Sequence, residues 1–196
     1  MKNIAIFASG SGTNAEKIMQ HFEHNAEICV SLIVCNKPGA KVLERAAKYR
    51  VPTEVITRQS FYEEKSILKI LNEYGIDFVV LAGFLWLVPP YLVKAYDRRM
   101  VNIHPALLPK YGGKGMYGMN VHRAVCEAKE PQSGITIHYV NEDYDEGDIV
   151  FQATCAIDEN DTPDDIAEKV RQLEHRYFPG VVEQLVRQLP STGGAP

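Results

Sequence analysis

Residues 3–14 read NIAIFASGSGTN, and this stretch decides the fold. After Asn3, its first six residues continue as an apolar run without polar alternation, which is typical of a strand buried on both faces of a sheet. The next six are polar and include Gly10 and Gly12, and residues 15–24 then have the spacing of an amphipathic helix. A buried strand, a glycine turn and a helix begin a βαβ unit. We therefore expect an α/β fold around a parallel sheet.

Strands and helices continue to alternate along the chain. In order, the pattern predicts strands at 28–35, 51–56, 78–82 and 100–103, and helices at 41–49, 61–74 and 121–128. Residues 133–141 and 148–155 then form two strands joined by a short acidic turn, which favours an antiparallel hairpin. The prediction is a Rossmann-like open sheet, mostly parallel, with an antiparallel hairpin near the C-terminal end and helices on both faces.

The C-terminal part contains one more helix. Thr162 and Pro163 have the residue types preferred at an N-cap and at the first helical position, and two acids follow in the first turn. Pro179 is expected to kink or interrupt this helix. Because no repeat or linker is evident, we expect a single domain over residues 1–189, with residues 190–196 as a disordered tail.

Composition and charge limit the classes of partner. The 196 residues include 21 Lys and Arg against 25 Asp and Glu, a net charge of −4, so we expect no nucleic-acid partner. The longest apolar stretch, 78–90, is shorter than the ~20 residues that span a bilayer, so no membrane partner is expected. The four cysteines form no C-x-x-C pair or zinc spacing, and the N-terminus lacks the pattern of a signal peptide. We therefore expect a cytoplasmic protein without a metal.

The loop at residues 9–14 predicts an anion site. Helix N–H groups and the positive end of the helix dipole face one point there, and the two glycines allow a close backbone approach. One alternative is an ordinary turn. Another is a dinucleotide site, because Gly10-x-Gly12-x-x-Ala15 fits that fingerprint. The dinucleotide motif also requires an acid at the end of the second strand, where this chain has Cys35-Asn36-Lys37, so a phosphate monoester is favoured over NAD.

Asn102 and His104 are candidates for catalysis. Alternate residues of a strand point to the same side, so both side chains should project together at the carboxyl end of a central strand, where α/β sheets bind ligands. An amide beside an imidazole can stabilise an oxyanion and transfer a proton. The alternative is a histidine that only hydrogen-bonds a neighbouring loop. The other histidines, His138 included, have no such polar partner in register and are expected to be structural.

Three further segments each allow two interpretations. The acidic turn at 141–148 is either a solvated hairpin end or a source of one inward carboxylate that raises the pKa of a nearby histidine; it lacks the closing Glu of a calcium loop. The apolar stretch at 81–89 is either core or a slot for a flat heterocycle. Arg171 and Glu174 lie three apart on the last helix and are either a surface ion pair or, with His175, a group that carries chemistry.

Four motifs in this order resemble the folate-dependent phosphoribosylglycinamide formyltransferases of purine synthesis. They are SGSGTN at 9–14, LAGF at 81–84, NIHPALLPKY at 102–111 and Tyr144-Asp145-x-Gly147, and the resemblance runs from residue 1 to about 189. It implies that the formyl group of 10-formyltetrahydrofolate, the co-substrate, passes to the primary amine of glycinamide ribonucleotide. It also implies small-molecule substrates, no metal, and a monomer or weak homodimer.

The resemblance further implies a role for each motif. Asn102 and His104 would stabilise the tetrahedral oxyanion, His104 would move a proton to the leaving folate nitrogen, and Asp145 would raise the pKa of His104. The residues implied to bind the ribonucleotide are Gly12, Thr13, Asn14 and Glu174. Those implied to bind the folate are Arg58, Leu85, Trp86, Leu87, Val88, Asn102 and Val140.

Other functions remain as alternatives. Formyltetrahydrofolate hydrolase and methionyl-tRNA formyltransferase share the catalytic trio, but they add an N-terminal regulatory domain or a C-terminal barrel, and we expect neither here because the chain begins at its first strand and ends after one helix. A non-catalytic module that binds a nucleotide phosphate would tolerate His104→Ala. A Rossmann oxidoreductase is disfavoured by the missing ribose acid.

Overall fold

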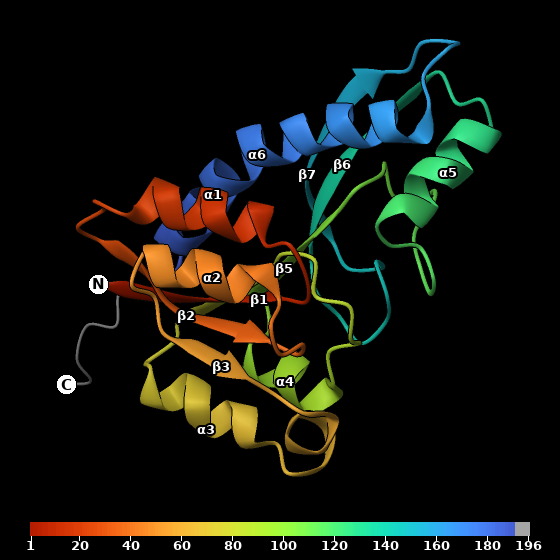
Figure 1. The fold of residues 1–196 in the computed structure, drawn as a ribbon. Coiled ribbons are helices and arrows are strands. Elements are labelled where there is room, and N and C mark those ends of the chain that lie inside the picture. Colours follow the sequence, from red (N-terminus) through yellow and green to blue (C-terminus); the bar gives the residue numbers. More distant parts are fainter. Residues whose placement is uncertain (191–196) are drawn as a thin grey trace.

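Seven strands form one sheet in the computed structural model, which describes residues 1–190 (Figure 1). Their order across the sheet is β3-β2-β1-β4-β5-β6-β7. The strands are β1 (Lys2–Ala8), β2 (Ile28–Cys35), β3 (Thr53–Val55), β4 (Phe78–Leu81), β5 (Met100–His104), β6 (Gln132–Tyr139) and β7 (Ile149–Ala156). The first five pair in parallel, whereas β6 runs antiparallel to both of its neighbours. The predicted mostly parallel sheet with a C-terminal hairpin is confirmed.

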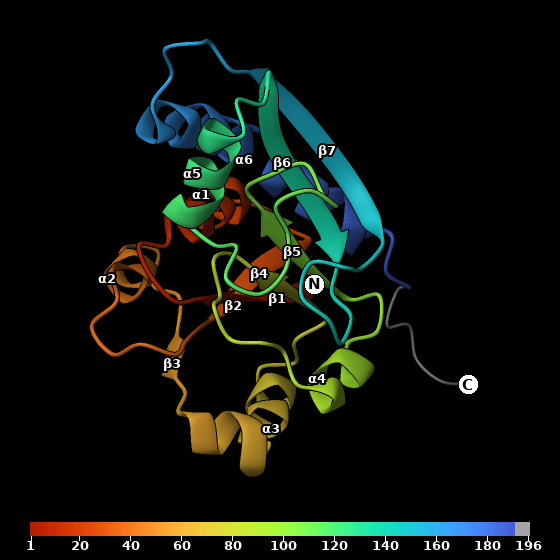
Figure 2. The same cartoon turned by 90° about the vertical axis from the view of Figure 1, so that its right-hand side faces the viewer.

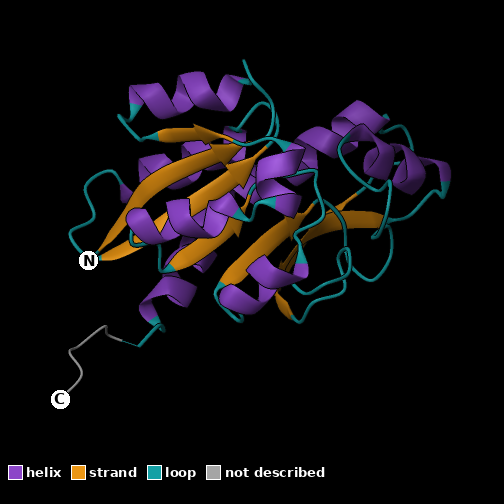
Figure 3. Ribbon diagram, turned by 90° about the horizontal axis from the view of Figure 1, so that it is seen from below, coloured by secondary structure: helices purple, strands orange, loops and turns teal. Residues whose placement is uncertain are grey.

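Helices cover both faces of the sheet (Figures 1 and 3). One face carries α1 (Thr13–Phe22), α2 (Lys41–Lys48), α5 (Met119–Glu127) and α6 (Pro163–Arg187). The other carries the π-helical turn η1 (Gln59–Glu63), α3 (Ser66–Glu73) and α4 (Pro90–Ala95). Within these 190 residues, no helix has the length and apolar character needed to cross a membrane.

Strand β1 explains why the deciding stretch is apolar throughout. Ile4, Ile6 and Ala8 pack into the core under α1 and α6, whereas Ala5 and Phe7 pack into the core on the opposite face. All five side chains are fully buried. Since side chains alternate between the two faces of a strand, a strand covered on both sides requires apolar residues at every position.

The single helix predicted at residues 61–74 is wrong. The chain forms η1 and α3 instead, separated by Lys65 in the left-handed conformation, with φ of 55°. Phe61 and Ile67 are both fully buried, although they are six residues apart. In an unbroken helix these positions would lie about 120° apart around the axis. The break allows both side chains to reach the same core.

The last helix is not interrupted at Pro179. The helix α6 runs through this residue for 25 residues, and it begins with a capping box between Thr162 and Asp165. Phe178, Val181 and Val182 are buried on either side of the proline, so their packing holds the helix across the missing hydrogen bond. Of the tail predicted at 190–196, Pro190 accepts a hydrogen bond from Lys2 Nζ (2.6 Å), and the rest lies outside the described residues.

The strand order places a crevice at the carboxyl ends of the parallel strands. The chain adds β2 and β3 on one side of β1, then returns to add β4 and β5 on the other side. Loops that follow β1 and β4 therefore diverge, which is the arrangement at which open α/β sheets bind ligands. Strand β5 lies beside β4 in the sheet (Figure 2) and runs parallel to it, so its last residue, His104, lies at the same end of the sheet.

Candidate active site

A cavity of about 1060 Å³ lies at the carboxyl ends of the parallel strands. It is lined by the loops after β1, β4 and β5, by the turn between β6 and β7, and by α6. The predicted site residues that line it are Gly12, Thr13, Asn14, Leu85, Trp86, Leu87, Val88, Asn102, His104, Val140, Asp145 and Glu174. Arg58 is not among the lining residues. The volume is just above the range of about 300–1,000 Å³ that is usual for small-molecule sites.

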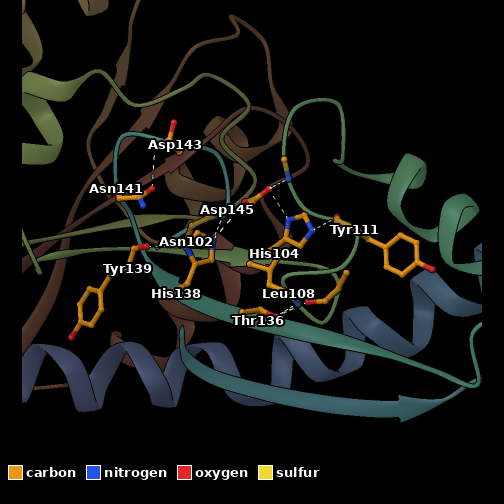
Figure 4. A network of polar contacts seen from close by, with 12 residues as sticks. Asn102, His104, Leu108, Tyr111, Thr136, His138, Tyr139, Asn141, Asp143 and Asp145 are labelled. Atoms are coloured by element: carbon orange, nitrogen blue, oxygen red, sulfur yellow. Dashed lines mark hydrogen bonds and ion pairs between the residues drawn. The ribbon is translucent and has the colours of Figure 1, made fainter. Parts of the chain in front are cut away.

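His104 and Asp145, which both line the cavity, lie against each other (Figure 4). The Nδ1 atom of His104 lies 3.4 Å from Oδ2 of Asp145, and the two side chains are 4% and 11% exposed. Asp145 has φ of 58°, so the turn between β6 and β7 directs this carboxylate inward while Glu142 and Asp143 remain exposed. One carboxylate of the acidic turn therefore belongs to the site and not to a solvated hairpin end.

Burial governs the pKa of both groups. Burial lowers the pKa of His104 below its ordinary value, and the smaller upward effects of Asp145 and of the Tyr111 carbonyl do not reverse this. The expected upward effect of Asp145 is thus present, but the net pKa is lowered. Burial alone would raise the pKa of Asp145, yet the imidazoles of His138 and His104 and the N–H of Gly113 hold the pKa of this carboxyl below its usual range. Asp145 is therefore ionised and His104 largely neutral at pH 7.

Asn102 is held by two partners. Its Nδ2 atom lies 3.1 Å from Nε2 of His138 and 3.3 Å from Oδ1 of Asp145. The Nδ1 atom of His138 lies 2.9 Å from the Tyr139 carbonyl, which can only accept, so in the neutral ring Nε2 is an acceptor for the amide. The side-chain amide is thereby fixed at the cavity wall.

His138 is a site residue that the sequence analysis missed. The expectation that it has no polar partner in register is wrong, because the β5–β6 pairing places it directly opposite Asn102. His122 on α5 also lines the cavity; it is buried, and its Nδ1 atom has no hydrogen-bond partner within residues 1–190. Burial and the nearby His104 lower the pKa of His122. In the sequence, His122 is marked only by its position shortly after the glycine-rich stretch at residues 112–118.

The loop after β1 forms one end of the cavity. Gly12 has φ of 70°, and a Cβ atom there would lie 2.5 Å from Cβ of Val42, so both backbone conformation and contact with α2 require glycine. Asn14 donates a hydrogen bond from Nδ2 to Oε2 of Glu174 (3.0 Å). Burial raises the pKa of Glu174 to about 7, against the opposing effects of Asn14 and Arg171. The alternative of a surface pair is wrong, since Arg171 binds Glu168 instead.

The segment after β4 forms the opposite end. Leu85 N donates to Ser9 Oγ, and Tyr62 Oη donates to the Leu87 carbonyl, both at 2.9 Å, so the segment is fixed at two points. Leu85 is half exposed, whereas Val88 is buried in the core. Leu85 to Val88 line the cavity and Val88 also belongs to the core, so this stretch combines the two interpretations.

Arg58 lies beside this segment. Its guanidinium carbon is 5.1 Å from the ring centroid of Trp86, and Trp86 does line the cavity. Phe61 and Phe84 pack against the same indole ring. The predicted cation is thus close to the apolar end of the site, one stacked ring away from the cavity.

The fold and this cluster together define a class of enzyme. The formyl transferase family model matches residues 2–182, the part of the chain that contains the sheet, Asn102, His104 and Asp145. The chain belongs to the formyl transferase family. Within the described residues, no group of three His, Cys, Asp or Glu side chains could hold a metal ion.

The more similar relatives carry one particular name. A phosphoribosylglycinamide formyltransferase from Bacillus subtilis is 37% identical over 191 residues, which cover 95% of both chains. A chloroplastic phosphoribosylglycinamide formyltransferase from Arabidopsis thaliana is 41% identical over 92% of this chain, and the match spans 64% of that relative's length. The crystal structure of phosphoribosylglycinamide formyltransferase from Bacillus halodurans superposes with a TM-score of 0.87 at 38% identity, covering 97% of this chain and 98% of that one.

Proposed function

We propose that this chain transfers the formyl group of 10-formyltetrahydrofolate to the primary amine of glycinamide ribonucleotide. The observation that carries the proposal is that one cavity joins three parts. The loop at Gly12 to Asn14 is suited to a phosphate, the segment at Leu85 to Val88 is suited to a flat heterocycle, and His104 lies between them. Its relatives of that name, in bacteria and plants, support the same reaction.

The proposed chemistry is an acyl transfer. The substrate amine forms a bond to the formyl carbon, the resulting oxyanion is stabilised by Asn102 and His104, and the bond from that carbon to the folate nitrogen then breaks. The amine loses one proton and the folate nitrogen gains one, so no net proton is released. His104, largely neutral at pH 7, can accept the first proton, and ionised Asp145 stabilises the imidazolium that forms. His138 holds the Asn102 amide in place.

An absorbance assay for the folate product tests the function. Turnover is expected only when glycinamide ribonucleotide is present. Turnover without the ribonucleotide would instead assign a hydrolase, and ribonucleotide binding without turnover would assign a binding module. We expect His104→Ala to lower kcat by ~10²-fold or more while the fold is retained; a variant with unchanged kcat would contradict the assignment.

We further propose that the protein acts in the cytoplasm as a monomer or weak homodimer. Its net charge of −4 favours small-molecule substrates over nucleic acid. Sedimentation velocity over a range of protein concentrations tests the oligomeric state, and a stable tetramer would contradict it.

A further inference from the structure

One main-chain turn contacts both members of the His104–Asp145 pair. The carbonyl oxygen of Tyr111 lies 2.7 Å from Nε2 of His104, and the N–H of Gly113 donates to Oδ2 of Asp145 at 3.0 Å (Figure 4). The same Oδ2 atom faces Nδ1 of His104. A single turn, residues 111–113, therefore contacts Nε2 of His104 and also the Asp145 oxygen that faces Nδ1 of His104.

These contacts determine where His104 binds its exchangeable proton. A carbonyl oxygen can only accept a hydrogen bond, so Nε2 must carry a hydrogen in both the neutral and the charged ring. The nitrogen that titrates is then Nδ1, which is the one beside Asp145. A proton gained at Nδ1 lies between the ring and a carboxylate oxygen that the Gly113 N–H keeps in place.

We propose that the turn at 111–113 is the positioning element of the catalytic pair and that Gly113 is its critical residue. The turn fixes the Nε2–H tautomer of His104 and keeps Asp145 against Nδ1. The inference deepens the proposed function, because it assigns the proton-transfer step to one nitrogen.

The turn is built to keep this geometry. Gly113 has φ of 90°, a conformation that other residues adopt only with strain. A Cβ atom on Gly112 would lie 2.6 Å from Leu108 Cδ2 and 3.3 Å from Asp145 Cβ, so the turn is packed directly against the carboxylate. On its outer side, Tyr111 Oη donates to Glu130 (2.8 Å), which ties the turn to the start of β6.

The ring nitrogens can be observed directly in the wild-type protein. ¹⁵N NMR of histidine-labelled protein distinguishes a protonated imidazole nitrogen from a bare one. Above the pKa of His104, we expect a protonated Nε2 and a bare Nδ1, with Nδ1 changing as the pH is lowered. A neutral ring protonated at Nδ1 would overturn the proposal. This result does not depend on activity, so it separates failure of this inference from failure of the proposed function.

Gly113→Ala tests the contact between the turn and the Asp145 carboxylate. The strain should displace the N–H from Asp145, raise the pKa of that carboxyl in a ¹³C NMR titration, and lower kcat ~10- to 100-fold with KM for the ribonucleotide within about twofold. Gly115→Ala is the matched control, because Gly115 has φ of 91° and open space around it, and the pKa of Asp145 should not change. A folded Gly113→Ala variant with the wild-type pKa of Asp145 would overturn the proposal; the wild-type ¹⁵N result decides it if that variant does not fold.

Discussion

Asn14 and Glu174 are 160 residues apart in sequence and are joined by a 3.0 Å hydrogen bond that links α1 to α6. The bond orients a carboxyl group whose pKa is raised to about 7 because it is buried. This partly buried acid makes both the stability of the protein and the charge at the Gly12–Asn14 end of the cavity depend on pH.

Glu174→Gln should remove a pH dependence of stability. Between the unfolded pKa of about 4.5 and the folded pKa of about 7, the folded protein binds more protons, so its free energy of unfolding falls as pH rises through this window. A shift of this size corresponds to at most about 3 kcal/mol. Urea unfolding at pH 5 and pH 8 measures this effect. From pH 5 to pH 8, the free energy of unfolding of the wild type should fall relative to that of the variant. Glu168→Gln, on the exposed face of α6, is the control, and equal pH slopes in wild type and Glu174→Gln would contradict the prediction.

Asp145→Asn should lower the pKa of His104 further. Burial already lowers that pKa, and the carboxylate is the largest of the effects that oppose burial. We expect the imidazole to titrate at a lower pH in the variant, as measured by ¹H NMR, and kcat to fall by ~10²-fold or more. Glu142→Gln, an exposed neighbour in the same turn, should leave both unchanged. A higher or equal pKa in Asp145→Asn would exclude the assigned electrostatic role.

His138→Ala should reduce kcat without weakening ribonucleotide binding. The change removes the acceptor at 3.1 Å from Asn102 Nδ2, so the amide can rotate away from the reacting group. We expect kcat to fall ~10-fold or more, with a ribonucleotide Kd within about twofold of wild type by calorimetry. His24→Ala, at an exposed histidine, is the control. Equal loss of kcat and affinity would point to a general structural defect.

Gly12→Ala should weaken ribonucleotide binding and destabilise the fold. The new Cβ atom would lie 2.5 Å from Val42 Cβ at a residue with positive φ, so the loop or α2 must move. Gly10→Ala is the matched control for stability, because a Cβ atom there meets nothing within 4 Å. Thermal unfolding and calorimetry measure the two effects. Similar melting temperatures for the two variants would show that the contact with Val42 is not limiting.

The sequence predicts those parts of the site that depend on local periodicity. Asn102 and His104 occupy alternate positions of one strand, so their common direction follows from the pleat alone. His138 could not be placed in the same way, because the register of β5 against β6 is set by packing along the whole hairpin. Similarly, only the turn conformation decides that Asp145 points inward while Asp143 stays exposed.

The same limit explains the errors in the fold. The helical spacing of residues 61–74 is real on each side of Lys65, but no local rule indicates that Lys65 adopts a left-handed conformation. Pro179 has an unfavourable intrinsic propensity within a helix, and burial of α6 against the sheet overrides it. The folate contact of Arg58 stays a prediction, since the position of its guanidinium depends on how Trp86 packs.

Because the site depends on the pairing of β5 with β6, recovered turnover reports whether a refolded chain has the correct strand register. Neighbouring residues on β6 face opposite sides, so a slip by one position would bring Ile137 opposite Asn102 and turn the imidazole of His138 away. Such a chain would keep nearly native circular dichroism and still lack the acceptor that fixes the amide. Recovered turnover, not recovered secondary structure, is therefore the measure of how many molecules have regained the native hairpin.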